Sequence, residues 1–172
     1  MGGLAVAKVS SAGEAQVACV TPTGNWPLLL AVPDEALPTE EARRVLPAEY
    51  SRADAVANVQ NSMLLLAAFV QGRRDLLASG LQDRMHQPYR AVLCPLLPAL
   101  QKLTGTPGIL GAALSGAGPS VLIFLDGKVG ANLTLAQVGN HLRSCGLKAE
   151  LIRTTIMKQG ARQGKAWINR RS

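Results

Sequence analysis

Two arginines and a histidine-containing segment have the side chains needed to bind a small anion. Residues 86–90 read His-Gln-Pro-Tyr-Arg, so an imidazole, an amide and a guanidinium lie within a few residues of a rigid proline. Arg43 supplies a second guanidinium, and two arginines converging on one carboxylate would form paired, charge-assisted hydrogen bonds. Spacing alone also allows a simpler interpretation, in which Arg90 is solvated in a helix connection and Arg43 balances the acidic residues beside it.

A second candidate site is a run of small residues, namely Ser115, Gly116, Ala117, Gly118, Pro119 and Ser120. Glycines can adopt positive φ and approach a ligand closely, and successive backbone N–H groups can form an anion-binding nest. A tight turn between two core strands requires similar residues, so the pattern by itself leaves both interpretations open. It is not a Walker loop, because no Gly-Lys-Ser/Thr follows.

Hydrophobic periodicity predicts the elements that must position these residues. Strands are expected over 3–10, 15–21, 27–33, 109–114, 121–125 and 148–155, and helices over 39–44, 51–72, 74–84, 95–103 and 134–145. This order predicts an α+β fold in which an antiparallel sheet carries helices on one face.

The helix expected over 51–72 has the strongest signal. Its N-terminus matches a capping box at Ser51 and Asp54. One apolar stripe follows, formed by Val56, Val59, Met63, Leu66 and Val70, and further apolar residues widen it. A helix that is apolar over most of its circumference is expected to be buried between other elements.

Length, composition and charge limit the classes of protein to which this chain can belong. The chain has 172 residues, 48% of them hydrophobic, and a net charge of +7, which fits one folded domain or slightly more and excludes a disordered or collagen-like chain. The excess charge lies in residues 143–172, which hold eight basic residues against Glu150. Such a tail could bind nucleic acid or an anionic membrane. It contains no recognisable reading motif, so we expect a solvated tail and no nucleic-acid partner.

The cysteines indicate a reducing compartment. Cys19, Cys94 and Cys145 are odd in number and far apart, which fits neither a disulfide framework nor a zinc site. We therefore expect a cytoplasmic protein with free thiols and no metal ligands. The longest apolar runs, 63–70 and 91–100, are too short to cross a bilayer, and the N-terminus lacks a signal peptide, so no membrane segment is expected.

Four segments together, 39–47, 51–56, 83–90 and 114–120, resemble in order those of homoserine kinases, within the GHMP kinase superfamily. The resemblance implies a GHMP kinase C-terminal domain and transfer of the γ-phosphoryl group of ATP to L-homoserine in threonine biosynthesis, with Mg²⁺ accompanying ATP. By match to the family motifs, Arg43 and Arg90 would bind the substrate carboxylate, and the loop from Ser115 to Ser120 would lie beside the transferred phosphate. No proton-transfer role is assigned to His86, and no catalytic residue is identified.

The family's Pro-x-x-x-Gly-Leu-Gly-Ser-Ser phosphate loop has no counterpart in this sequence. The resemblance therefore divides the chain into strands left from a nucleotide-binding domain (1–32), a GHMP kinase C-terminal domain (33–157) and a basic tail (158–172). We expect no kinase activity from the isolated chain. An alternative function is a non-catalytic amino-acid-binding or regulatory module derived from the kinase. Unpaired edges on the first strands would be compatible with a homodimer.

Overall fold

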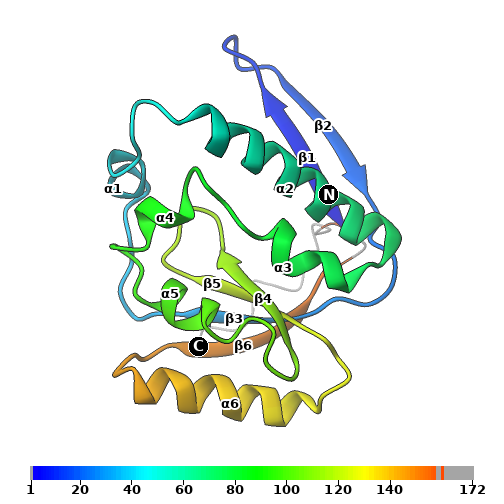
Figure 1. Cartoon of the computed structure of the whole chain (residues 1–172), viewed down its shortest axis with the longest axis vertical. Coiled ribbons are helices and arrows are strands. Elements are labelled where there is room, and N and C mark those ends of the chain that lie inside the picture. Colours follow the sequence, from blue (N-terminus) through cyan, green and yellow to red (C-terminus); the bar gives the residue numbers. More distant parts are fainter. Residues whose placement is uncertain (1, 158–159, 161–172) are drawn as a thin grey trace, which may run out of the picture.

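The computed structural model describes residues 2–157 and Gly160, so the predicted basic tail otherwise lies outside the described residues. Its strands form two antiparallel sheets (Figure 1). A hairpin pairs β1 (Leu4–Val9) with β2 (Ala15–Val20). The larger sheet has the order β4 (Ile109–Leu114), β5 (Val121–Leu125), β3 (Pro27–Val32) and β6 (Glu150–Thr155).

The helices include one with the predicted bounds, at 39–44, others with shifted ends, and one at 87–90 that was not predicted. They are α1 (Thr39–Arg44), α2 (Arg52–Gln71), the 3₁₀ turn η1 (Arg74–Leu76), α3 (Leu77–Gly80), α4 (Gln87–Arg90), α5 (Leu96–Gln101) and α6 (Ala131–Ser144). The predicted start and end of α2 are confirmed, because Ser51 Oγ accepts a hydrogen bond from Asp54 N at 3.0 Å and Gly72 ends the helix at φ 69°.

The single helix predicted over 74–84 is wrong, because the chain forms η1 and the short α3 before a loop. Gly80 explains part of the break: a Cβ there would lie 2.9 Å from the backbone of Leu65, so α3 crosses α2 in close contact. Pro38 is the capping residue of α1, and Thr39 is already inside the helix.

The sheet core is built on β3, which is apolar at consecutive positions. Leu29 and Ala31 pack with residues of α5 and α6, whereas Leu28 packs with α2 and with Leu77 of α3. Because alternate side chains of a strand point to opposite faces, the helices cover both faces of β3. The α+β fold with an antiparallel sheet is thus confirmed, but the helices are not confined to one face.

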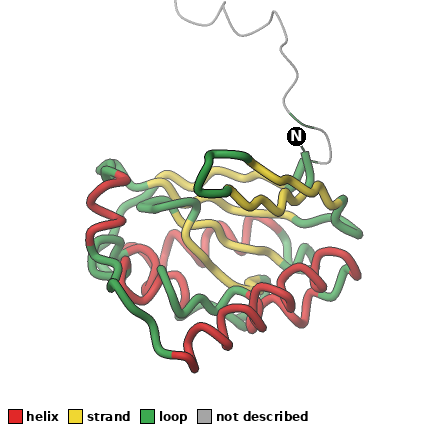
Figure 2. Tube along the Cα trace, turned by 90° about the horizontal axis from the view of Figure 1, so that it is seen from above, coloured by secondary structure: helices red, strands yellow, loops and turns green. Residues whose placement is uncertain are grey.

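β3 lies inside the larger sheet, paired with β5 on one side and β6 on the other, so among the described strands the hairpin alone stands apart. The domain boundary predicted at residue 32 stays a prediction. The hairpin is joined to the rest of the fold near its ends: Gly3 N donates to Met157 O at 2.6 Å. The N-terminus therefore lies beside the end of β6, at the edge of the strands in Figure 2.

The expectation that the apolar stripe of α2 is buried is wrong. Ala68 and Phe69 on the other side of the helix enter the core, whereas Val59 and Met63 are 64% and 61% exposed. By length and composition alone α2 could also cross a membrane, which the uninterrupted apolar runs did not indicate. That is weak evidence, because core helices of soluble proteins pass the same test.

Candidate functional site

Asp83 organises the histidine-containing segment. Its carboxylate accepts hydrogen bonds from the backbone N–H groups of Met85 (2.8 Å), His86 (3.0 Å) and Gln87 (2.7 Å). These bonds satisfy donors at the start of α4, which otherwise has no side-chain cap. His86 Nδ1 lies 3.4 Å from the same carboxylate. Sequence reasoning did not single out Asp83, although an Asp a few residues before a helix proline is a typical cap signal.

Arg90 is fixed against α1. Its Nε donates to the backbone oxygen of Ala42 at 3.0 Å, and Ala42 is the buried residue that directly precedes Arg43. The two predicted carboxylate ligands are therefore tied to neighbouring positions although they are far apart in sequence. Arg90 is half-buried and Arg43 is exposed. The terminal nitrogens of Arg90 make no hydrogen bond to the residues that the structure describes, so they can donate to a ligand.

Gln87 joins the histidine-containing segment to the glycine-rich loop. Its side chain is 8% exposed; Nε2 donates to Leu81 O at 3.1 Å, and Oε1 accepts from Leu114 N at 3.1 Å. Leu114 ends β4 and immediately precedes the loop. This buried amide therefore places the two predicted motifs side by side, a role that the sequence did not reveal.

The loop from Ser115 to Ser120 has the backbone predicted for it. Gly116 and Gly118 have φ values of 67° and 94°, and the Gly118–Pro119 peptide bond is cis. Ser115 N donates to Ser120 O at 2.9 Å, which closes the turn between β4 and β5. A Cβ on Gly116 would meet nothing within 4 Å, so the backbone there faces open space.

Cys94 supports the far end of the same loop. Its thiol donates to Pro119 O at 3.0 Å and is almost completely buried. Burial raises the pKa of the Cys94 thiol, so it remains a neutral donor at physiological pH.

A cavity of about 330 Å³ lies between these parts and is lined by Asp83, His86, Gln87, Arg90, Ala113, Leu114 and Gly116. The fold thus brings Arg90, His86 and the first glycine of the loop to one hollow, whereas Arg43 is not part of its lining. The volume suits a small polar molecule. Among the described residues, no group of three or more His, Cys, Asp or Glu could hold a metal ion.

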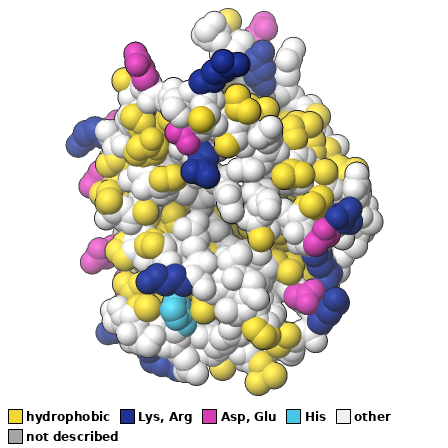
Figure 3. All heavy atoms as spheres, in the orientation of Figure 1, with side chains coloured by type: hydrophobic (Ala, Val, Ile, Leu, Met, Phe, Trp, Pro, Cys, Tyr) yellow, Lys and Arg dark blue, Asp and Glu magenta, His cyan; other side chains and the backbone are white. Residues whose placement is uncertain are grey.

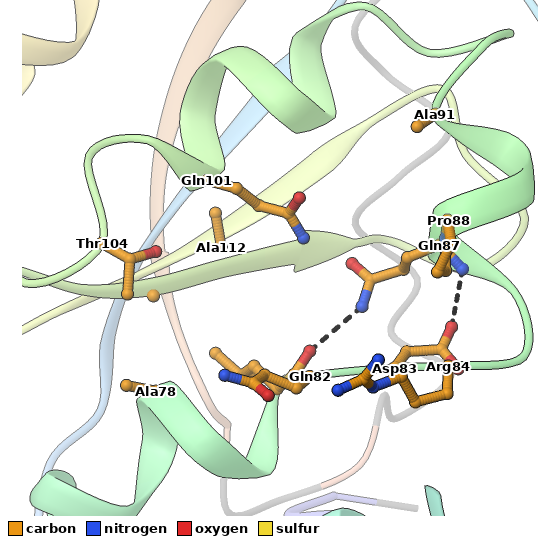
Figure 4. A pocket seen from close by; sticks show the side chains of 12 residues that line it. Ala78, Gln82, Asp83, Arg84, Gln87, Pro88, Ala91, Gln101, Thr104 and Ala112 are labelled. Carbon is orange, nitrogen blue, oxygen red and sulfur yellow. Dashed lines mark hydrogen bonds between the residues drawn. The ribbon is translucent and has the colours of Figure 1, made fainter. Parts of the chain in front are cut away.

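A larger cavity of about 490 Å³ shares the wall formed by Asp83 and Gln87. Figure 4 shows both side chains at that wall, with Gln82 and Arg84 on one side and Gln101 and Thr104 on the other. Asp83 and Gln87 therefore separate two hollows, and neither side chain is free to turn toward a ligand without losing its backbone bonds.

Comparison with known proteins identifies the domain. Residues 65–144 match the family model described as GHMP kinases C terminal. Over these residues the chain has the fold of a GHMP kinase C-terminal domain. The matched residues contain the histidine-containing segment, the cavity lining and the glycine-rich loop, whereas α1 with Arg43 precedes them.

Curated relatives and solved structures agree with that assignment. The chain is 46% identical over 134 residues to a homoserine kinase of Deinococcus radiodurans, covering 78% of this chain and 43% of the relative. It is 35% identical over 161 residues to one of Microchaete diplosiphon, covering 94% and 52%. A homoserine kinase structure from Cytophaga hutchinsonii has a TM-score of 0.78 at 23% identity, covering 92% of this chain and 50% of that one. The chain thus spans about half the length of these relatives.

Proposed function

We propose that this chain contributes the substrate-carboxylate and phosphate-facing groups of a homoserine kinase, which transfers the γ-phosphoryl group of ATP to the hydroxyl of L-homoserine. The observation that supports this most strongly is the shared cavity of Arg90, His86 and Gly116, placed there by Gln87. The curated relatives, all homoserine kinases, supply the substrate. The pathway would be threonine biosynthesis and the location the cytoplasm.

In this proposal Arg90 binds the substrate carboxylate with the nitrogens that Ala42 leaves unoccupied, and Arg43 approaches the same group from the end of α1. Charge-assisted bonds from two guanidinium groups would orient the amino acid in the cavity. The loop from Ser115 to Ser120 lies at the other end, where N–H groups near Gly116 can approach a phosphate without steric hindrance.

Little covalent chemistry is required of these residues. Phosphoryl transfer depends mainly on alignment of the donor and acceptor oxygens and on stabilisation of the transferred charge. ATP brings its Mg²⁺ as part of the substrate, and the described residues contain no acidic cluster that would hold the ion. This chain would therefore orient L-homoserine, the phosphoryl acceptor. Most of the residues that bind ATP would lie in the part of the relatives that this chain does not span.

The test is a fusion protein. The half of the Microchaete diplosiphon relative outside the aligned residues is placed before this chain, and ADP release is measured with ATP and L-homoserine. We expect turnover that requires both substrates. Arg90→Ala should lower kcat/KM by about 10- to 100-fold, since a charged hydrogen bond is worth about 1.5–3 kcal/mol.

Arg52→Ala is the matched control, because Arg52 is an exposed arginine at the start of α2 and does not line the cavity. It should leave kcat/KM unchanged. Phosphorylation of a hydroxy acid without an amino group in preference to homoserine would contradict the proposed substrate. Equal losses from both arginine variants would contradict the proposed role of Arg90.

A further inference from the structure

Strand β4 lies at one edge of the larger sheet, and its outer side is only partly paired. Leu114 N donates to Oε1 of Gln87 at 3.1 Å, so this N–H points away from β5 and the Leu114–Val121 pair is not hydrogen-bonded. Hydrogen-bonded and non-hydrogen-bonded pairs alternate along an antiparallel ladder. The backbone N–H and C=O of Ala112, two residues earlier, therefore also point away from β5.

These two groups of Ala112 lack a protein partner within the part of the chain that the structure describes. Outside the ladder with β5, neither group forms a hydrogen bond to a described residue, although Ala112 is only 3% exposed. Buried backbone N–H and C=O groups of native proteins are almost always paired with protein, ordered water or a ligand. The edge of β4 at Ala112 can therefore bind a molecule that offers both a donor and an acceptor.

This edge opens into the cavity of about 490 Å³, which Gly111 and Ala112 line. Helices α3 and α5 flank β4 there (Figure 4), and a Cβ on Gly111 would lie 2.7 Å from Leu81 Cδ1. Figure 3 shows few charged side chains over the middle of this face, where Figure 1 places β4 between α3 and α5. The volume suits a molecule the size of a dipeptide.

Polar side chains reach the cavity from both sides. Gln101 at the end of α5 and Thr104 just after it supply an amide and a hydroxyl, which can donate and accept. On the other side, Arg84 is exposed and forms no ion pair with a described residue, and its backbone N–H is fixed by Asn58 Oδ1 at 3.0 Å. The neighbouring carboxylate of Asp83 already accepts three backbone N–H groups. Arg84 is therefore the charged group available to a ligand.

We propose that this cavity is a second binding site, which takes a short acylated peptide with a free carboxylate. Backbone amides of the ligand pair with the N–H and C=O of Ala112, as one further residue of the sheet would. The carboxylate is bound by Arg84 through charge-assisted hydrogen bonds. Binding at Ala112 is independent of the proposed kinase function, which uses the smaller cavity beyond Asp83 and Gln87.

The neighbouring position on the same edge already shows this kind of recognition. The side-chain amide of Gln87 supplies the acceptor for Leu114 N, as a backbone amide of a further strand would. Gln87 also closes the edge beyond Ala112, so a long strand from another protein has no continuous edge to pair with. An inorganic anion would leave Ala112 O without a donor, and a metal cation would leave Ala112 N without an acceptor. A small molecule with peptide amides satisfies both groups.

The test is an NMR titration of the ¹⁵N-labelled chain with N-acetyl-alanyl-alanine, up to about 10 mM. We expect the N–H signal of Ala112 to shift with a Kd of about 1 mM or tighter, as suits so small a ligand. Acetyl-lactyl-lactate has the same shape with esters in place of amides, so it cannot donate to Ala112 O. It should bind at least tenfold more weakly. No shift at Ala112, or equal affinity for the ester, would overturn the proposal.

Two variants test the groups of the protein. Arg84→Gln should weaken binding about tenfold, since a charged hydrogen bond is worth about 1.5–3 kcal/mol. Arg52→Gln is the matched control, because Arg52 is exposed and does not line the cavity, and its affinity should be unchanged. Ala112→Pro removes the N–H, and proline is tolerated on an edge strand where that group faces outward. It should also bind at least tenfold more weakly.

The ester probe keeps the test decisive if the Ala112→Pro chain does not fold. Equal losses from the Arg84 and Arg52 variants would contradict carboxylate binding by Arg84. Shifts confined to the signals of Gly116 and Arg90 would place the probe in the smaller cavity and would overturn the proposal, because both residues line that cavity and neither lines the larger one.

Discussion

At the scale of single residues, the side chains that hold the site together do so by hydrogen bonds to backbone atoms. Asp83 binds three N–H groups, Gln87 bridges Leu81 O and Leu114 N, and Cys94 donates to Pro119 O. Each bond fixes a main-chain segment whose own side chains or N–H groups face the cavity. The geometry of the cavity therefore depends on these supporting residues as well as on Arg90.

Cys94 gives a prediction about thiol reactivity. Burial raises its pKa and shields its sulfur, whereas Cys19 and Cys145 are exposed. At pH 8 we expect iodoacetamide to label Cys94 at least tenfold more slowly than the other two, since the thiolate is the reactive form. Peptide mass spectrometry measures the three rates, and labelling in urea is the control in which they should converge. Rapid native labelling of Cys94 would show that the thiol is not held under the loop.

The same raised pKa has a consequence for stability. The native state keeps the Cys94 proton at pH values where the unfolded chain has lost it. The stability that comes from this retained Cys94 proton is therefore fully present below the ordinary thiol pKa of about 8.5. It is lost as the pH rises through the higher pKa of the native state.

At the scale of elements, α4 and β4 are coupled by one amide. Gln87 is buried at the start of α4, and Leu114 N lies at the end of β4. The loop from Ser115 to Ser120 continues directly from that strand. The position of the glycine-rich loop relative to Arg90 consequently depends on Gln87, which bonds directly to the strand that leads into the loop.

Gln87→Leu should destabilise the protein by about 2–4 kcal/mol, because the partly buried carbonyl of Leu81 and N–H of Leu114 lose their partners. Gln82→Leu is the control: Gln82 is an exposed glutamine in the preceding turn, and its replacement should change the free energy of unfolding by less than about 0.5 kcal/mol. Urea unfolding measures both. Similar values for the two variants would mean that the Gln87 bridge does not stabilise the fold.

At the scale of the whole molecule, stability is unevenly distributed. The larger sheet is covered by two buried clusters, whereas the hairpin is exposed on both faces. Segments with few buried contacts open locally at low cost in free energy.

We therefore expect the paired backbone amides of β1 and β2 in the isolated chain to exchange with deuterium at least 100-fold faster than those of β3 and β5. Hydrogen exchange read by mass spectrometry checks this, with α6, a helix covered on one side, as an internal reference. Protection of the hairpin equal to that of β3 would contradict the prediction.

The sequence by itself determined most of the local structure and the order of the motifs. Ser51 and Gly72 marked the ends of α2, and the strands around the glycine-rich loop were placed correctly. Gly116 and Gly118 have the positive φ that a residue without a Cβ can adopt. These features depend on capping, alternation and glycine geometry, which act over a few residues. The resemblance to homoserine kinases rested on the same segments and agrees with the family match.

Only the tertiary structure decided which of these pieces meet. Strand pairing placed β3 inside the larger sheet, and the helix predicted over 74–84 is divided into η1, α3 and a loop where α3 packs closely on α2 at Gly80. The bond from Arg90 to Ala42 O and the bridge through Gln87 join residues 48 and 27 positions apart. Periodicity predicted one wide apolar stripe on α2 but could not show which part of the helix surface meets the core, because burial depends on what packs against a helix and not on the helix alone.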